Sequence, residues 1–552
     1  MDDEVKDLGD QLFRGELTRR DFIQRGLALG MTASAVGLLL YNAAPVLAAM
    51  ERHQSPSPRM GGTLRVADPG PTPGGLDPAV QQDTATIGIC HNIYNFLVRI
   101  DEHLIPYPDL ATKWSASADG LTWTLPLRKG VKFHSGKSFT AADAIYSLNR
   151  IKNLGLGGAS LLTNVSSMEM SGPYTLVIHV KTPTPDLPNF LADYHMCIIE
   201  NGFDPNIAAT SFAPKKGYAG GYVKFTSGPS GTGPFMLKDF VPGDHATLVR
   251  NPHYFEAPYP YLDTVKFLYL PQPSTQVAAV QSGQVDFITV LTPAQVTPLL
   301  NAPGIKITTL PTTAFLNMRM RADRKPFSDV RVRQAFKYIV DRKAVDQVLV
   351  NGMSPLGNDT PISPGFGQWY SNIPVRPHDP MKAQALLSAA GYTKEKPLTV
   401  KLYAANSAGA LQFATAYQQM AGDVPNVAIS IVSDTVSTYY TYWLKADFAI
   451  TSWGARTVPQ EILDLLYREK AVWNEGHYYN PRLEGLLTAT GSELNTAKRK
   501  SLYRQIETLL SDDGPSIIPS YNVFALPLRT RVQGFTPLPD TFHYYKTAWV
   551  TS

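Results

Sequence analysis

The sequence predicts an α/β fold with mixed sheets, because strand-like and helix-like segments alternate along the chain. Near the start, Leu64 and Val66 alternate with polar residues as in a strand. Residues 328–352 carry a long helical pattern, and residues 516–528 return to a strand pattern. A chain of 552 residues is too long for one small core, so we expect about two to four domains.

The first half of the chain is predicted to be rich in strands. A turn-rich loop follows the first strand, and helical spacing of apolar residues then begins in residues 84–100. Strands are expected within residues 121–133, 174–180, 230–240 and 264–270, and residues 274–290 are typical of a helix, a glycine turn and a strand.

Two clear helices are predicted in the second half. The first spans residues 328–352, with Ser328 as its cap and Gly352 at its end. The second spans residues 497–514. The buried stripes are expected to consist of Val332, Ala335, Phe336 and Ile339 in the first helix and of Leu502, Ile506 and Leu509 in the second.

The composition is that of a globular protein, with 44% hydrophobic and 17% charged residues. The formal charge is only +4, and no dense basic run with interleaved aromatic residues occurs. Nucleic-acid binding is therefore not expected.

The N-terminus resembles an export signal. Arg19 and Arg20 precede an apolar stretch from Gly26 to Leu40, and Val46 and Ala48 offer the small-residue pattern of a cleavage site. The arginine pair resembles a twin-arginine signal, although Gln24 stands where Lys is common. We expect residues 1–48 to be a signal peptide, 49–60 a disordered lead-in, and the mature protein to be soluble and periplasmic.

Motifs for catalysis, cofactors or structural metals are not found. The segment HSGKS at residues 134–138 lacks the spacing of a phosphate-binding loop, GPSGTG at 228–233 lacks that of a nucleophile elbow, and the 11 histidines are scattered. Cys90 and Cys197 form no CxxC motif, and whether they pair in a disulfide is left open. We expect a protein that is not an enzyme and that holds no cofactor.

Six segments, in order, resemble the family 5 solute-binding proteins of ABC importers. They include GLDPA at residues 75–79, GTGPFMLKDFVPGDHATLVRNPHYF at 231–255, QSGQVDF at 281–287, PFSDVRVRQAFKYIVDR at 326–342 and YNPRLEGLL at 479–487. The longest begins LATKWSASADGLTWTL at residue 110. Together they span residues 61–530.

The resemblance implies a two-lobed periplasmic binding protein fold, class II-like and of cluster C, with an extra inserted domain. Lobe I would comprise residues 61–105, 235–311 and 518–552, the inserted domain residues 106–234, and lobe II residues 312–517. A solute would bind between the lobes, and a hinge would close over it.

The resemblance also suggests site residues, beginning at the end of a predicted strand, in SWGAR. Trp453 matches a tryptophan of peptide-binding members, whereas Arg456 stands where those members carry an aspartate that anchors the peptide's amino terminus. The reversed charge favours a solute with an exposed anion, or one without a free amine. Alternatively, Arg456 faces solvent or pairs with an acidic residue (Asp434, Asp447 or Glu461), and Trp453 packs in the core.

Two further residues are carried over from the resemblance. Thr72 lies in a loop that borders the ligand in relatives, and Phe315 lies two residues before the matched Asn317. Each is equally compatible with plain loop structure or packing.

The function implied is that of a periplasmic substrate-binding component that captures a small peptide-like or opine-like organic solute, or an oligosaccharide. The expected partners are an inner-membrane ABC permease and ATPase complex, and the protein is expected to be a monomer. Alternatives are a nickel or metal-chelate binding protein, and a periplasmic enzyme or chaperone on the same scaffold.

Overall fold

The computed structural model describes residues 57–69, 76–79, 84–154, 157–202, 230–241, 243–471, 473–538 and 543–551. The predicted signal peptide and Thr72 lie outside these residues. The contacts within the chain divide it into two compact units, Met1–Arg59 and Met60–Ser552. The second unit is described below by itself.

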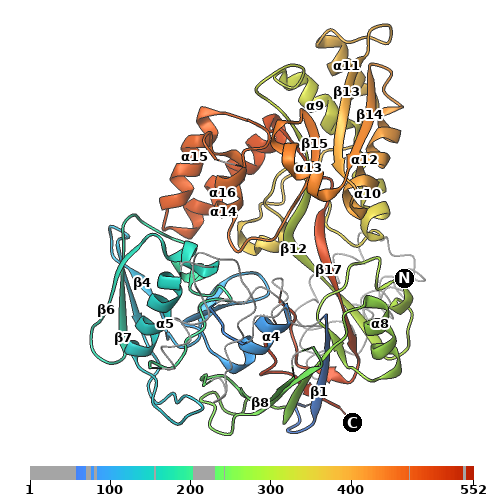
Figure 1. The fold of residues 1–552 in the computed structure, drawn as a ribbon. Helices are drawn as coiled ribbons and strands as arrows, with labels where there is room; N and C mark the ends of the chain where they lie inside the picture. Colours follow the sequence, from blue (N-terminus) through green and yellow to red (C-terminus); the bar gives the residue numbers. More distant parts are fainter. Residues whose placement is uncertain are drawn as a thin grey trace, which may run out of the picture. The chain divides into compact units, whose positions relative to one another are not determined.

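One mixed sheet of eleven strands runs through this unit (Figure 1). The pairs β1–β10 and β13–β14 are parallel, whereas β9–β10 and β12–β15 are antiparallel, so the predicted α/β class with mixed sheets is confirmed. The strand order is β14 (Val427–Asp434), β13 (Leu398–Ala405), β15 (Phe448–Trp453), β12 (Ile305–Met320), β17 (Tyr521–Arg529), β11 (Phe287–Ile288), β1 (Thr63–Asp68), β10 (Thr264–Tyr269), β9 (His245–Arg250) and β8 (Phe235–Val241), and β16 (Ser516–Ile517) pairs with β12.

The long strand β12 joins the two halves of this sheet. Its residues Ile305–Pro311 pair with β17, and its residues Phe315–Met320 pair with β15. Between Pro311 and Phe315 the register shifts, so residues 312–314 interrupt the regular ladder. In Figure 1, β12 and β17 run between the group of elements around β13, β14 and β15 and the group around β1 and β8.

Helices cover the half of the sheet that contains β13, β14 and β15. They are α9 (Val330–Ile339), α10 (Arg342–Val350), α11 (Pro380–Ala389) and α12 (Ala408–Ala421). The predicted stripe of α9 is confirmed, because Val332, Ala335, Phe336 and Ile339 are fully buried in one hydrophobic core.

The prediction of one helix over residues 328–352 is wrong, because two helices occupy it. Val340 adopts an extended conformation, and Asp341 then caps α10 by accepting from the backbone N–H groups of Lys343 and Ala344. Asp329 caps α9 in place of the expected Ser328. An aspartate inside an amphipathic pattern can thus restart a helix, which periodicity does not reveal.

Three further helices pack together beside this half: α14 (Pro459–Tyr467), α15 (Pro481–Ser492) and α16 (Thr496–Asp513). The predicted second helix is confirmed as α16. Its buried side includes Ile506, whereas Leu502 and Leu509 are only half-buried, and it also includes the polar residues Arg499 and Glu507.

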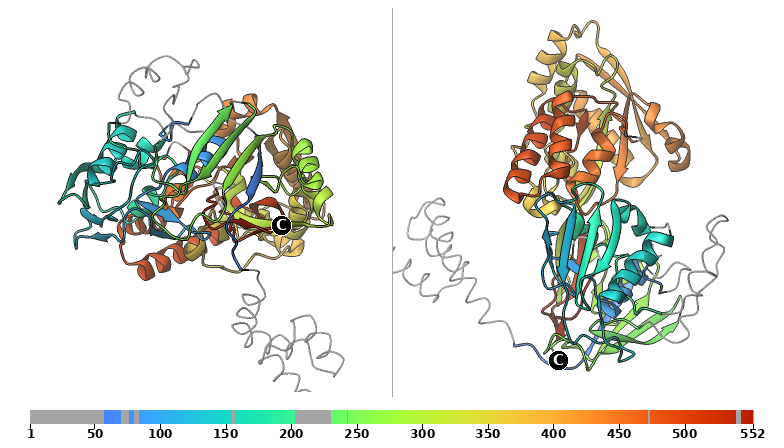
Figure 2. Two further views of the ribbon diagram at one scale, coloured as in Figure 1. Left: turned by 90° about the horizontal axis from the view of Figure 1, so that it is seen from below. Right: turned by 90° about the vertical axis from the view of Figure 1, so that its left-hand side faces the viewer.

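A smaller antiparallel sheet is formed entirely by residues 115–180. Its order is β4 (Ser115–Ala116), β5 (Thr122–Pro126), β7 (Thr175–Val180) and β6 (Val165–Met170), and α5 (Ala141–Leu154) packs beside it (Figure 2). Two further strand pairs are β2 (Val98–Ile100) with β3 (Pro106–Pro108) and β18 (Val532–Gln533) with β19 (Trp549–Val550). The remaining α-helices are α4 (Thr84–Ile93), α6 (Leu187–Phe190), α8 (Pro273–Ser282) and α13 (Val436–Tyr442). The 3-10 helices are η1 (Gly157–Leu162), η2 (Thr297–Leu299), η3 (Pro364–Trp369) and η4 (Trp443–Lys445).

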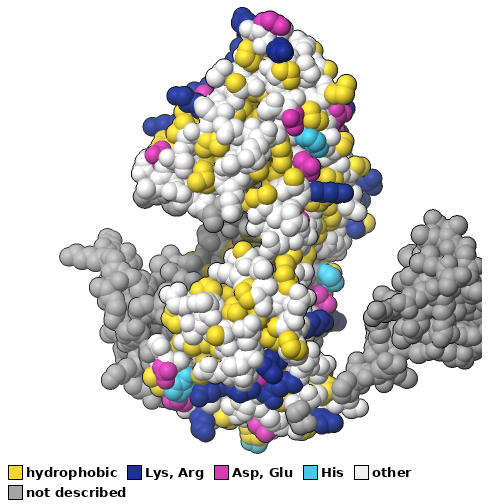
Figure 3. All heavy atoms as spheres, turned by 90° about the vertical axis from the view of Figure 1, so that its right-hand side faces the viewer, with side chains coloured by type: hydrophobic (Ala, Val, Ile, Leu, Met, Phe, Trp, Pro, Cys, Tyr) yellow, Lys and Arg dark blue, Asp and Glu magenta, His cyan; other side chains and the backbone are white. Residues whose placement is uncertain are grey.

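The surface carries charges of both signs. On the face in Figure 3, acidic and basic side chains are interspersed with uncharged ones, and basic side chains gather near its lower end. Cys90 and Cys197 are two separate buried thiols and do not form a disulfide. Among the described residues, no helix is long and apolar enough to span a membrane.

Candidate functional site

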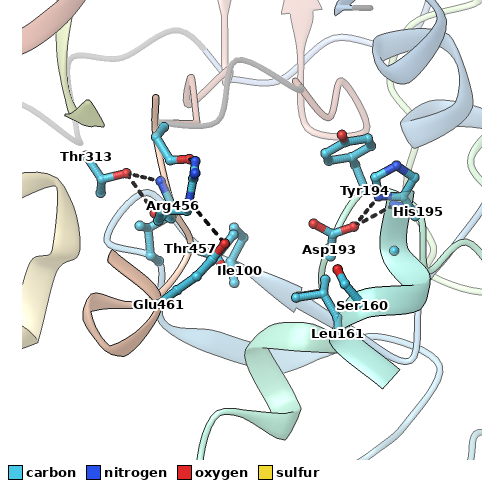
Figure 4. Close-up of a pocket in the computed structure, with 14 residues that line it drawn as sticks. Ile100, Ser160, Leu161, Asp193, Tyr194, His195, Thr313, Arg456, Thr457 and Glu461 are labelled. Carbon is cyan, nitrogen blue, oxygen red and sulfur yellow. Dashed lines mark hydrogen bonds and ion pairs between the residues drawn. The ribbon is translucent and has the colours of Figure 1, made fainter. Parts of the chain in front are cut away.

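A cavity of about 310 Å³ is lined by residues from distant parts of the chain (Figure 4). Ile100 and Leu104 come from β2 and the turn after it. Two further groups, at residues 158–161 and 192–195, come from η1 and from the segment after α6. The remaining lining residues are Thr313 of β12, Ala455, Arg456 and Thr457 after β15, and Glu461 of α14.

The loop after β15 is held in place by the interrupted part of β12. The Thr313 hydroxyl accepts a hydrogen bond from the Arg456 backbone N–H and donates to the Arg456 carbonyl oxygen, both at 2.7 Å. Ser363 Oγ donates to the carbonyl of Thr312 at 2.8 Å, and a Cβ on Gly365 would lie 2.6 Å from that carbonyl. Residues 312–314 are therefore packed from both sides, which fixes the position of Arg456 on the cavity wall.

The Arg456 guanidinium is only partly engaged. Nε lies 3.1 Å from Glu461 Oε1, and Nη1 donates to the carbonyls of Ala455 and Gly454 at 2.9 and 3.4 Å. Among the described residues Nη2 has no partner, and 24% of the side chain is exposed. Of the acidic partners that the sequence left open (Asp434, Asp447 and Glu461), Glu461 is the one that lies beside Arg456, and Arg456 also lines the cavity.

Burial and neighbouring charges shift the pKa of the Glu461 carboxyl group. Burial raises the pKa of its carboxyl, the positive charge of Arg456 lowers it, and the negative charges of Asp193 and Asp186 raise it further. Glu461 and Asp193 therefore interact electrostatically, and Figure 4 draws them on facing sides of the cavity.

The opposite wall carries Asp193, Tyr194 and His195. Asp193 Oδ1 accepts from the His195 backbone N–H at 3.0 Å and lies 2.7 Å from His195 Nδ1. The rings of Tyr194 and His195 lie 3.9 Å apart, centroid to centroid. Both the Asp193 and His195 side chains are nearly buried, with 12% and 7% exposed.

Trp453 and Phe315 do not line this cavity. Trp453 is 5% exposed, donates from Nε1 to Glu475 Oε1 at 2.9 Å, and packs edge-on against Trp443 and Trp473. Phe315 is fully buried and pairs with Trp453 across β12 and β15. The structure thus places both in the packed core behind the loop that carries Arg456, and Thr72 lies outside the described residues.

The sequence did not single out Asp193 and His195 as site residues, and named Glu461 only as a partner for Arg456. Asp193 and His195 follow a helix of four residues, α6, and no spacing links them to Arg456, far along the chain. Only the fold brings them to one cavity. Among the described residues, no group of three or more His, Cys, Asp or Glu side chains could hold a metal ion.

Comparison with known proteins places the chain among binding proteins. Residues 106–473 match the family model described as "Bacterial extracellular solute-binding proteins, family 5 Middle". The chain is 24% identical to the glutathione-binding protein GsiB of Pectobacterium atrosepticum over 510 residues, covering 86% of this chain and 92% of that protein. It is 25% identical to heme-binding protein A of Haemophilus influenzae, covering 85% and 90%, and 24% identical to the dipeptide-binding protein of Escherichia coli, covering 84% and 89%.

Solved structures show the same fold. HbpA2 from Haemophilus parasuis matches with a TM-score of 0.79 at 21% identity, covering 89% of this chain and all of that chain. The unliganded open form of MppA, a periplasmic murein tripeptide binding protein, matches with a TM-score of 0.78 at 22% identity, covering 90% and 99%. The protein has the two-lobed fold of periplasmic binding proteins, and it belongs to the family 5 bacterial extracellular solute-binding proteins.

Proposed function

We propose that the protein captures a small organic solute with an exposed anionic group and delivers it to an ABC importer. The observation that carries this proposal is the position of Arg456, on the wall of a cavity, with Nη2 unpartnered among the described residues. A guanidinium binds carboxylate or phosphate through parallel N–H groups, and a partly enclosed site strengthens that contact.

The size of the cavity and the names of the relatives support a small solute with a carboxylate. A volume of about 310 Å³ is at the lower end for ligand pockets. The relatives are named for binding glutathione, heme and dipeptides, and all of these ligands carry carboxylates. The peptide-like and opine-like candidates fit this chemistry better than an uncharged oligosaccharide does.

The proposal extends to the arrangement and partners of the protein. Lobe I would contain residues 61–105, 235–311 and 518–552, and lobe II residues 312–517, with residues 106–234 inserted. A monomer would be exported through a twin-arginine signal and would pass its solute to a permease and ATPase complex. Support for a division within β12 comes from the register shift between Pro311 and Phe315.

A thermal-shift screen of the exported protein tests the solute class. The panel contains dipeptides, tripeptides, opines, dicarboxylic acids, neutral oligosaccharides and a nickel–histidine chelate, the last of which covers the metal-chelate alternative. Ligands that bind the native state raise the melting temperature by mass action. We expect shifts from carboxylate-bearing compounds and none from the neutral sugars.

Substitution of Arg456 identifies its contribution. Arg456→Gln should weaken binding of the carboxylate-bearing hits by about tenfold or more, since a hydrogen bond to a charged group contributes about 1.5–3 kcal/mol. The matched control is Arg482→Gln, which changes an exposed arginine of α15 outside the cavity and should leave the affinity unchanged. Equal affinities for the wild type and Arg456→Gln would refute this role of Arg456.

A further inference from the structure

The cavity wall opposite Arg456 carries a carboxylate that is fixed in position. Both contacts from His195 go to Asp193 Oδ1, at 3.0 Å from the backbone N–H and 2.7 Å from Nδ1. Among the described residues Oδ2 of Asp193 has no partner. In Figure 4 one carboxylate oxygen of Asp193 meets His195 and the other is turned toward the side where Glu461 and Arg456 lie.

The charges of the wall do not favour a solute that is only anionic. Arg456 and Glu461 lie 3.1 Å apart with opposite charges, and the Asp193 carboxylate, whose Oδ2 has no partner among the described residues, adds a further acidic group to the wall. A carboxylate entering alone would share Arg456 with Glu461 and meet the field of Asp193. Because the Asp193 side chain is only 12% exposed, that field is weakly screened by solvent.

We infer that the bound solute is dipolar, with its anionic end at Arg456 and a cationic end, such as an ammonium group, at Asp193. This inference rests on the proposed function and specifies its substrate class. An ammonium group at Asp193 Oδ2 would form a charge-assisted hydrogen bond with this carboxylate oxygen. His195 acts as a positioning residue, because it holds Oδ1 and thereby directs Oδ2.

The inferred polarity is opposite to the one that the resemblance implies for peptide-binding members. Those members place an aspartate at the position of Arg456 and hold the amino terminus there. This chain has a cation at that position and an anion, Asp193, on the facing wall. A dipeptide would therefore lie in the reverse direction, with its carboxylate toward the loop after β15.

Chemically blocked dipeptides test the inference. The probes are an equimolar dipeptide library, the same library with acetylated amino termini, and the same library with amidated carboxyl termini. Native mass spectrometry identifies the tightest-binding free dipeptide, and calorimetry then gives its affinity and those of its two blocked forms. Each block should weaken binding to the wild type by about tenfold or more.

Four variants assign each end of the dipeptide to a wall. In Asp193→Asn the free dipeptide should bind about as weakly as its acetylated form, and acetylation should have little further effect. In Arg456→Gln the free dipeptide should bind about as weakly as its amidated form, and amidation should have little further effect. Asp193→Glu should recover part of the affinity, and Asp423→Asn, an exposed aspartate beyond α12, should bind like the wild type. Such coupling between a protein change and a ligand change separates a direct contact from general destabilisation.

Several outcomes would overturn the inference. One is that acetylated dipeptides bind as tightly as free ones, and another is that acetylation couples to Arg456 instead of Asp193. If dicarboxylic acids bind through Arg456 and no dipeptide library binds, the dipolar solute is excluded and the proposed function stands. If neither the thermal-shift compounds nor the dipeptide libraries bind, the proposed function and the dipolar solute are both excluded.

Discussion

At the residue scale, Glu507 of α16 is a carboxyl group held in an unfavourable setting. It is fully buried, its Oε1 accepts from the Ser371 N–H at 3.3 Å, and its Oε2 has no hydrogen-bond partner among the described residues. Burial raises the pKa of Glu507 to about 7, with smaller opposing effects from Ser371 and Arg504. The folded protein therefore takes up a proton that the unfolded chain, with a glutamate pKa of 4.5, takes up only at lower pH.

Stability should consequently depend on pH through Glu507. Between pH 4.5 and about 7 the native state binds more protons than the unfolded state, so this group makes stability fall as pH rises. In Glu507→Gln that contribution disappears. The difference in free energy of unfolding between the two proteins should change by about 2–3 kcal/mol between pH 4.5 and 8, measured by urea denaturation. In the exposed control Glu469→Gln, the free energy of unfolding should depend on pH as it does in the wild type. The prediction would be contradicted if Glu507→Gln also showed the wild-type dependence on pH.

At the element scale, the break between α9 and α10 shows where periodicity reaches its limit. The apolar stripe of α9 was predictable because Val332, Ala335, Phe336 and Ile339 repeat at helical spacing and are all buried. The break was not, since it depends on the Asp341 side chain competing for backbone N–H groups at 3.0 and 3.2 Å.

The two aspartate caps lead to a paired prediction. Asp341→Ala should lower the free energy of unfolding by about 1 kcal/mol, because two N–H groups at the start of α10 lose their acceptor. Ser328→Ala should have little effect, because Asp329 supplies the cap of α9. Urea denaturation of both variants measures the difference. A larger loss of unfolding free energy for Ser328→Ala than for Asp341→Ala would indicate that Ser328 caps the helix, as expected from the sequence.

At the scale of the whole molecule, a buried ion pair joins segments far apart in the chain. Arg499 of α16 binds Asp186, beside α6, through two parallel hydrogen bonds of 2.6 and 2.5 Å, and the two side chains are 3% and 7% exposed. The Arg499 guanidinium carbon also lies 5.2 Å from the ring centroid of Trp369 and 5.4 Å from that of Tyr503. The pair thus fastens the segment next to the cavity residue Asp193 to α16.

Removing one partner should be much more harmful than removing both. Asp186→Leu leaves a buried guanidinium unpaired and should lower the free energy of unfolding by about 3–5 kcal/mol. The double variant Asp186→Leu/Arg499→Met should recover much of that loss. The control is Arg468→Met, which breaks a partly exposed pair with Glu484 and should lose about 1 kcal/mol or less. Equal losses for the single and double variants, in urea denaturation, would show that the pair is not what stabilises this contact.

The sequence predicted the fold more completely than the site. The α/β class, the α9 stripe and the strand ending at Trp453 follow from local patterns, and the ordered segments resembling the family 5 binding proteins identified the family. The cavity depends instead on long-range packing, which brings Asp193 and His195 opposite Arg456. Arg456 was accessible to sequence reasoning because it departs from a known motif. Asp193 belongs to no motif from which it could depart. For Trp453 and Phe315 the sequence left both a ligand-facing role and core packing open, and in this structure both side chains are buried.

The interruption of β12 has one mechanical consequence. The regular run of pairs with β17 ends at Pro311, and at Phe315 pairing resumes, both with Tyr521 of β17 and with Trp453 of β15. Between these points the Thr313 hydroxyl forms two hydrogen bonds with the backbone of Arg456. A rotation of one half of the sheet against the other would therefore bend β12 at residues 312–314, and the two hydrogen bonds of Thr313 would move Arg456 with them.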